Sequence, residues 1–198
     1  MTFHLKGAIK GEDRKSITHL KSLLDISYDD AARTNEFQLK VRRKLFKTYE
    51  YMLEQTNGSS MILQQYPVAR LLRQVIMEEH RKSMDVMAFS ILPNHVHIVC
   101  EILQDFGDGN PWSDVTRRVK SQSARKINEY LKTSGAFWDS LNYEHPIFED
   151  QTLLKVIRYV VANPVKLGIA NVGNAWKWTY VKPEIQEVLS DISFGKVG

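Results

Sequence analysis

The sequence has almost no cysteine: Cys100 is the single one among 198 residues. A disulfide within the chain is therefore excluded, and a lone cysteine is typical of proteins from reducing compartments. A chain of this length needs no such crosslink, because it can bury about 70% of the surface that its unfolded form exposes. We expect a single domain over residues 1–198 that is stabilised by an apolar core.

Long apolar runs are also missing. No stretch approaches the roughly 18 apolar residues of a membrane-spanning helix, and residues 1–7 lack the apolar segment of a signal peptide. A strong excess of one charge is absent too, since the net charge is +4 and the pI is about 9.1. We expect no membrane association and a cytoplasmic, nucleoid-associated location, with a charge that is compatible with a polyanion partner without requiring one.

The most informative stretch is residues 90–100, with the sequence SILPNHVHIVC. Pro93 lacks an N–H and therefore suits the start of a β-strand. The alternation that follows places His95 and His97 on one face of that strand, and the apolar Val96 and Ile98 on the other. Two imidazoles that lie side by side in this way can share a metal ion.

Two other interpretations of the histidine pair are open at this point. The pair can arise by chance on the solvent face of a strand. Histidine-triad hydrolases carry a similar pattern, but they continue the alternation to a third histidine, and Val99 occupies that position here. A metal site also needs at least one further protein ligand, so the remaining sequence must decide.

Hydrophobic periodicity predicts an α+β sandwich in which helices cover one face of a sheet. The expected helices are residues 13–26, 36–54, 68–79, 113–132, 151–162 and 184–189. The expected strands are residues 3–9, 61–65, 84–92 and 95–101. The aromatic residues 137–147 suggest a further strand beside the helix at 113–132, and residues 57–60 read as a linker.

Two of the expected helices carry basic faces. The face of helix 36–54 is most simply a solvated surface, and it contains Lys40, Arg42, Arg43, Lys44 and Lys47. The face of helix 113–132 mixes basic residues with Ser121 and Gln122, which suits contacts to phosphates as well as it suits solubility. The basic residues of that second face include Arg117, Arg118, Lys120 and Arg125.

Two motifs together resemble a known family. Residues 92–99 (LPNHVHIV) and 158–168 (RYVVANPVKLG) are similar to motifs of the single-tyrosine HUH transposases, and most similar to the REP-associated tyrosine transposases. The resemblance extends over about residues 66–180. Leu92 stands where the family commonly has Met, which conserves volume. Residues 34–60 look like a helical insertion relative to many members.

The resemblance implies a ferredoxin-like sandwich with an antiparallel sheet, and an enzyme that cuts and rejoins single-stranded or hairpin DNA. Tyr159 would be the nucleophile that forms a 5′-phosphotyrosine. His95, His97 and Asn163 would bind Mg²⁺ or Mn²⁺, although imidazoles would also accept Zn²⁺. The resemblance leaves open whether the protein is a monomer or a homodimer. The alternative is a domesticated hairpin-binding protein with weak or no cleavage.

Helix geometry is consistent with these roles. Tyr159 and Asn163 are four residues apart, so they lie on one helix face, and Asn163 falls in the last turn because Pro164 follows it. Without the motif, Tyr159 would be most simply a buried core aromatic. Lys155, one turn earlier, either contacts the scissile phosphate or is simply exposed.

Overall fold

The computed structural model describes residues 1–22, 24, 36–55, 61–103, 111–171 and 176–194. Five strands form one sheet in the order β4-β1-β3-β2-β5, and all neighbouring strands are antiparallel. The strands are β1 (Thr2–Leu5), β2 (Met84–Ile91), β3 (His95–Ile102), β4 (Trp138–Tyr143) and β5 (Thr179–Val181). The helices are α1 (Gly11–Ser22), α2 (Glu36–Glu54), η2 (Ile62–Gln64), α3 (Tyr66–Glu79), α4 (Pro111–Leu131), α5 (Asp150–Lys166) and α6 (Pro183–Phe194).

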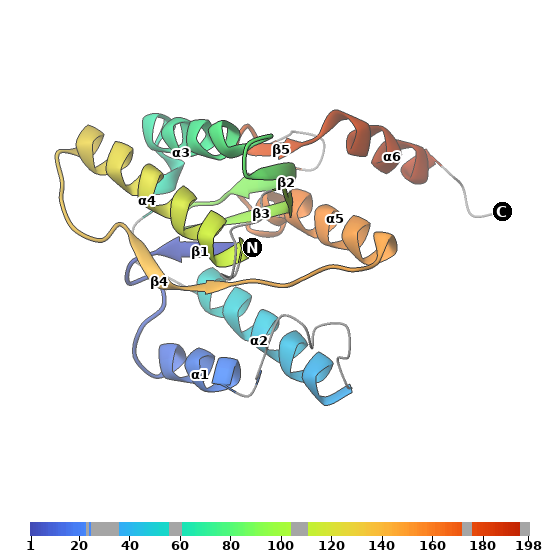
Figure 1. The fold of residues 1–198 in the computed structure, drawn as a ribbon, viewed down its shortest axis with the longest axis horizontal. Helices are drawn as coiled ribbons and strands as arrows, with labels where there is room; N and C mark the ends of the chain where they lie inside the picture. Colours follow the sequence, from blue (N-terminus) through green and yellow to red (C-terminus); the bar gives the residue numbers. More distant parts are fainter. Residues whose placement is uncertain (23, 25–35, 56–60, 104–110, 172–175, 195–198) are drawn as a thin grey trace.

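The elements β1, α3, β2, β3, α4 and β4 form a βαββαβ unit with the spatial strand order 4-1-3-2. This is the ferredoxin-like arrangement, and it confirms the predicted α+β class with an antiparallel sheet. Helices α1 and α2 occupy the connection between β1 and α3, and β5 extends the sheet beyond β2 (Figure 1). None of the described helices has the length and hydropathy that crossing a bilayer requires.

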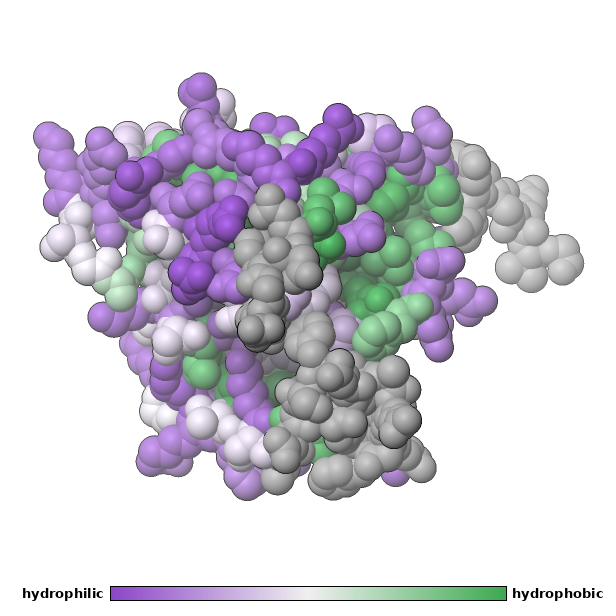
Figure 2. Space-filling model, in the orientation of Figure 1, coloured by the Kyte–Doolittle hydropathy of each residue, from purple (hydrophilic) through white to green (hydrophobic). Residues whose placement is uncertain are grey.

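Helices cover both faces of the sheet. On one face, Val96 and Ile98 of β3 belong to the main core together with apolar residues of α3 and α4, as predicted. On the other face, Val99 packs against Ile157 and Val160 of α5, an addition to the predicted one-sided layer. Figure 2 shows hydrophilic residues over α3 and α4 and a gathering of hydrophobic ones over α5 and α6. The histidines of β3 share the α5 face.

Several predicted boundaries differ from the structure. Strand β1 ends at Leu5, because the chain turns at Gly7, whose φ is +78°. Residues 61–65 form the 3₁₀ turn η2 instead of a strand; the Leu63 N–H donates to the Pro93 carbonyl and fixes the turn beside the β2–β3 connection. Helix α5 continues through Pro164 to Lys166. The linker expected at residues 57–60, and the end of the helix expected at 13–26, lie outside the described residues.

Candidate metal centre and nucleophile

His95 and His97 lie on β3, the middle strand of the sheet, and both side chains are buried. Their ring centroids are 4.9 Å apart. The His95 Nδ1–H donates to Asn94 Oδ1 over 2.6 Å, and His97 Nδ1 lies 2.8 Å from Thr2 Oγ1. These outer contacts fix both rings and turn each Nε2 toward α2 and α5, as is common for metal-ligating histidines.

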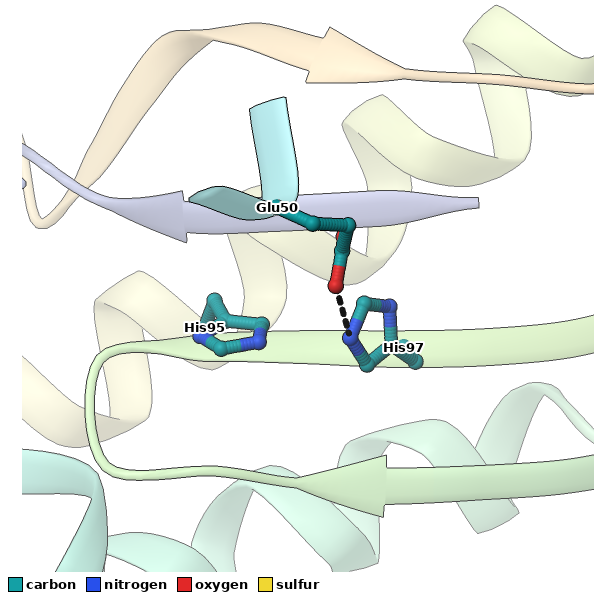
Figure 3. A group of neighbouring side chains, drawn as sticks. All are labelled: Glu50, His95 and His97. Carbon is teal, nitrogen blue, oxygen red and sulfur yellow. Dashed lines mark ion pairs between the residues drawn. The ribbon is translucent and has the colours of Figure 1, made fainter. Parts of the chain in front are cut away.

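A third candidate ligand comes from α2. Glu50 is buried, and its carboxylate points from that helix toward the histidine pair (Figure 3). Its Oε2 lies 3.4 Å from His97 Nε2, and ligand atoms of Glu50, His95 and His97 all lie within 4.8 Å of one another. Asn94 connects the same helix to the strand, because its Nδ2 donates to the Leu53 carbonyl over 3.0 Å.

Glu50 is not among the residues that the sequence motifs predicted. Position 50 lies on the apolar side of α2, four residues after Phe46 and three before Leu53. A carboxylate inside an apolar stripe is a local signal, because burying a charge is costly unless it has a partner. The partners themselves are distant in sequence, so periodicity alone does not identify them.

Helix α5 brings the predicted nucleophile to the same point. Asn163 is buried, and its Nδ2 lies 3.0 Å from His97 Nε2. The Tyr159 Oη donates a 2.6 Å hydrogen bond to Glu50 Oε2. The four residues predicted from the two motifs therefore meet in one place, together with Glu50.

Three buried polar atoms at this point have no hydrogen-bond partner among the described residues: His95 Nε2, Glu50 Oε1 and Asn163 Oδ1. Unpaired buried polar atoms are rare and costly, and three that converge are the arrangement expected of a cation site. Together with His97 Nε2 they offer two imidazole nitrogens, a carboxylate and an amide oxygen. This mixed donor set fits Mn²⁺ better than Mg²⁺, which prefers oxygen ligands.

Burial and charge set the protonation states. Burial, reinforced by the neighbouring His97, lowers the pKa of His95 to about 3, so its ring is neutral at pH 7. Burial alone would raise the pKa of Glu50, but His97, His95 and the hydrogen bond from Tyr159 bring it down to about 2. Burial and the Glu50 charge raise the pKa of Tyr159, so its phenol stays protonated in this arrangement.

The residues predicted to bind DNA fall in two places. Lys155 is exposed on α5 and lines a groove beside Tyr159. The other four lie on α4, across the sheet from the metal centre. Three of these four side chains contact other residues of the protein: Arg117 forms an ion pair with Asp114, Arg118 forms one with Glu79, and Lys120 donates to the Asp139 carbonyl. Contact of Arg117, Arg118, Lys120, Arg125 and Lys155 with DNA stays a prediction.

Comparison with known proteins bears on the fold. No family model and no curated protein matches the sequence. A solved structure of the REP-associated tyrosine transposase bound to a REP hairpin matches with a TM-score of 0.50 and 22% identity, over 72% of this chain and 76% of that chain. The chain has the fold of a REP-associated tyrosine transposase. This agrees with the family suggested by the motifs at residues 92–99 and 158–168.

Proposed function

We propose that this chain is a REP-associated tyrosine transposase that cuts and rejoins single-stranded DNA beside a hairpin. The observation that carries the proposal is the convergence of Tyr159 with His95, His97, Asn163 and Glu50 from three separate elements. A core tyrosine needs none of these neighbours. The hairpin is inferred from the solved transposase of the same fold, whose DNA is a REP hairpin.

In the proposed reaction, Tyr159 Oη attacks the scissile phosphorus and loses its proton. The new bond joins the phenol oxygen to phosphorus, and the bond to the 3′-oxygen breaks. This oxygen takes a proton from water, which leaves a 5′-phosphotyrosine and a 3′-hydroxyl. Glu50 orients the phenol and is the group placed to receive its proton. A later 3′-hydroxyl attacks the same phosphorus and releases Tyr159. One phosphodiester is exchanged for another, so no ATP is consumed.

The four ligand candidates fit a divalent cation, Mn²⁺ or Mg²⁺. Such a cation supplies positive charge that polarises the phosphate and stabilises the leaving oxygen. The protein's part is to hold His95 neutral, to keep Glu50 ionised, and to place Tyr159 one helical turn from Asn163.

A covalent trapping assay tests the proposal. A library of DNA hairpins with 5′ extensions, labelled at the 3′ end, is incubated with the protein and Mn²⁺ and separated on a denaturing gel. We expect a slow, protease-sensitive labelled band that disappears with EDTA and in Tyr159→Phe. Tyr180→Phe, in which the changed ring stacks on Phe89 away from the site, is the matched control and should keep the band.

Two outcomes would contradict the proposal. If Tyr159→Phe keeps the band, the nucleophile is another residue. If the wild-type protein gives no band but shifts the hairpins on a native gel, the chain binds hairpin DNA without cutting it.

A further inference from the structure

A groove of about 900 Å³ opens beside the metal centre. It runs between α2, the first turns of α5 and the segment that joins β4 to α5. Its lining includes His97 and Tyr159, so the groove leads directly to the proposed nucleophile. Its other lining residues include Arg42, Phe46, Tyr143, His145, Phe148 and Lys155.

Arg42 is the unusual residue in this groove. The basic face of α2 was expected to be solvated, yet Arg42 is only 6% exposed. Its Nε is buried and has no hydrogen-bond partner among the described residues. A guanidinium in this state is incompletely satisfied, and it is well suited to bind a phosphate. Arg43 and Lys155 add charge at the groove, while the two carboxylates in its lining, Glu101 and Glu149, are exposed.

A second unpaired atom lies in the same groove. His145 Nδ1 is buried and has no hydrogen-bond partner in the described part of the chain. Burial, and then the Arg42 charge, lower the pKa of His145, so the ring is neutral and offers one donor and one acceptor. Its ring stacks on Tyr143 at 6.3 Å with an interplanar angle of 16°.

Aromatic rings continue along the groove to the nucleophile. Phe46 contacts both Tyr143 and Tyr159, with ring centroids 5.4 and 5.3 Å apart. Phe148 lies at the groove with 70% of its surface exposed, the largest exposed fraction among the large hydrophobic side chains in the described part of the chain. Basic side chains beside aromatic rings are typical of grooves that bind single-stranded nucleic acid.

We propose that this groove holds the single-stranded nucleotides that flank the scissile phosphate. Arg42 binds a backbone phosphate, Phe148 stacks on a base, and His145 hydrogen-bonds to a base edge. The inference rests on the proposed function, because it takes Tyr159 as the point at which the strand is cut. It assigns a DNA-binding role to α2, a helix outside the βαββαβ unit.

The test measures binding, separately from cleavage. Fluorescence anisotropy with a labelled random-sequence pool of ten-nucleotide single strands is recorded in Mn²⁺ in a Tyr159→Phe background. We expect Phe148→Ala and Arg42→Gln each to weaken binding by roughly tenfold, the loss of one stacked base or one phosphate contact. Arg42→Gln should also reduce the log–log salt slope by about 0.7. Arg73→Gln, exposed on α3, is the control and should bind like the parent.

Two results would overturn the inference: Phe148→Ala that binds like the parent, or a parent that does not bind the pool. Because Phe148 is exposed, its variant should fold even if Arg42→Gln does not. The covalent band with hairpin DNA reports on the proposed function independently. A band together with an unchanged Phe148→Ala would reject the groove and retain the transposase.

Discussion

Tyr159 on α5 donates its phenolic hydrogen to the carboxylate of Glu50 on α2, across 2.6 Å and 109 positions of sequence. The same carboxylate lies 3.4 Å from His97 Nε2, so the nucleophile and the metal centre are connected through one side chain. Both partners come from the same chain.

This contact predicts the effect of Glu50→Gln. The amide that replaces the carboxylate has no charge and is a weaker ligand for a cation, so we expect Mn²⁺ affinity to fall by about tenfold or more. Isothermal titration calorimetry with Mn²⁺ measures the change. Glu54→Gln is the matched control, since Glu54 lies one turn later and pairs with Lys166. Equal Mn²⁺ affinity in Glu50→Gln and wild type would remove Glu50 from the metal centre.

Two substitutions of Asn163 should differ in their effect on Mn²⁺ binding. Asn163→Ala removes an oxygen donor, and we expect roughly tenfold weaker Mn²⁺ binding with a matching loss of covalent adduct at limiting Mn²⁺. Asn163→Asp keeps an oxygen at the same position and adds charge, so it should bind Mn²⁺ at least as well as wild type. Adduct yield across an Mn²⁺ titration distinguishes them. The ligand role fails if Asn163→Ala titrates like wild type.

The burial of His4 should make the stability of the protein depend on pH. The side chain is buried against Tyr49, and burial lowers its pKa from 6.5 to about 4 in the folded state. Between these two values the unfolded chain binds the proton and the folded chain does not, so stability is complete above pH 6.5 and decreases toward pH 4. At pH 5 the loss from this residue is about 2 kcal/mol.

Urea unfolding at pH 7 and pH 5 measures this loss. His4→Gln retains a partner for the Tyr49 hydroxyl and cannot titrate. Its free energy of unfolding should therefore fall less between pH 7 and pH 5 than that of wild type, by about 2 kcal/mol. An equal decrease in both proteins would show that His4 does not carry the effect.

Local patterns were sufficient to predict part of the site. Alternation along a strand placed His95 and His97 on one face, and helical spacing placed Tyr159 near Asn163. The structure confirms both placements. The strand order also agrees with the ferredoxin-like prediction, as does the packing of α3 and α4 on one face of the sheet.

The rest depends on contacts between distant residues. Thr2 contacts His97, which is 95 positions away in the sequence, and Glu50 contacts Tyr159, which is 109 positions away. Neither pairing can be predicted from local periodicity. The burial of Arg42 was missed for a different reason. Arg42 lies three residues before Leu45 and four before Phe46, on the apolar side of α2 that also carries Glu50. Helical spacing therefore held a signal for its burial, although the residue type favoured a solvated position.

The most direct test of the central claim locates the covalent bond itself. After reaction with hairpin DNA and nuclease trimming, tryptic digestion releases residues 159–166 (YVVANPVK), a peptide with one tyrosine. Tandem mass spectrometry should find the nucleotide remnant on this peptide, joined through a 5′-phosphate to Tyr159. A remnant on another tyrosine, such as Tyr143 in the same groove, or cut DNA with no protein-linked nucleotide, would contradict the account.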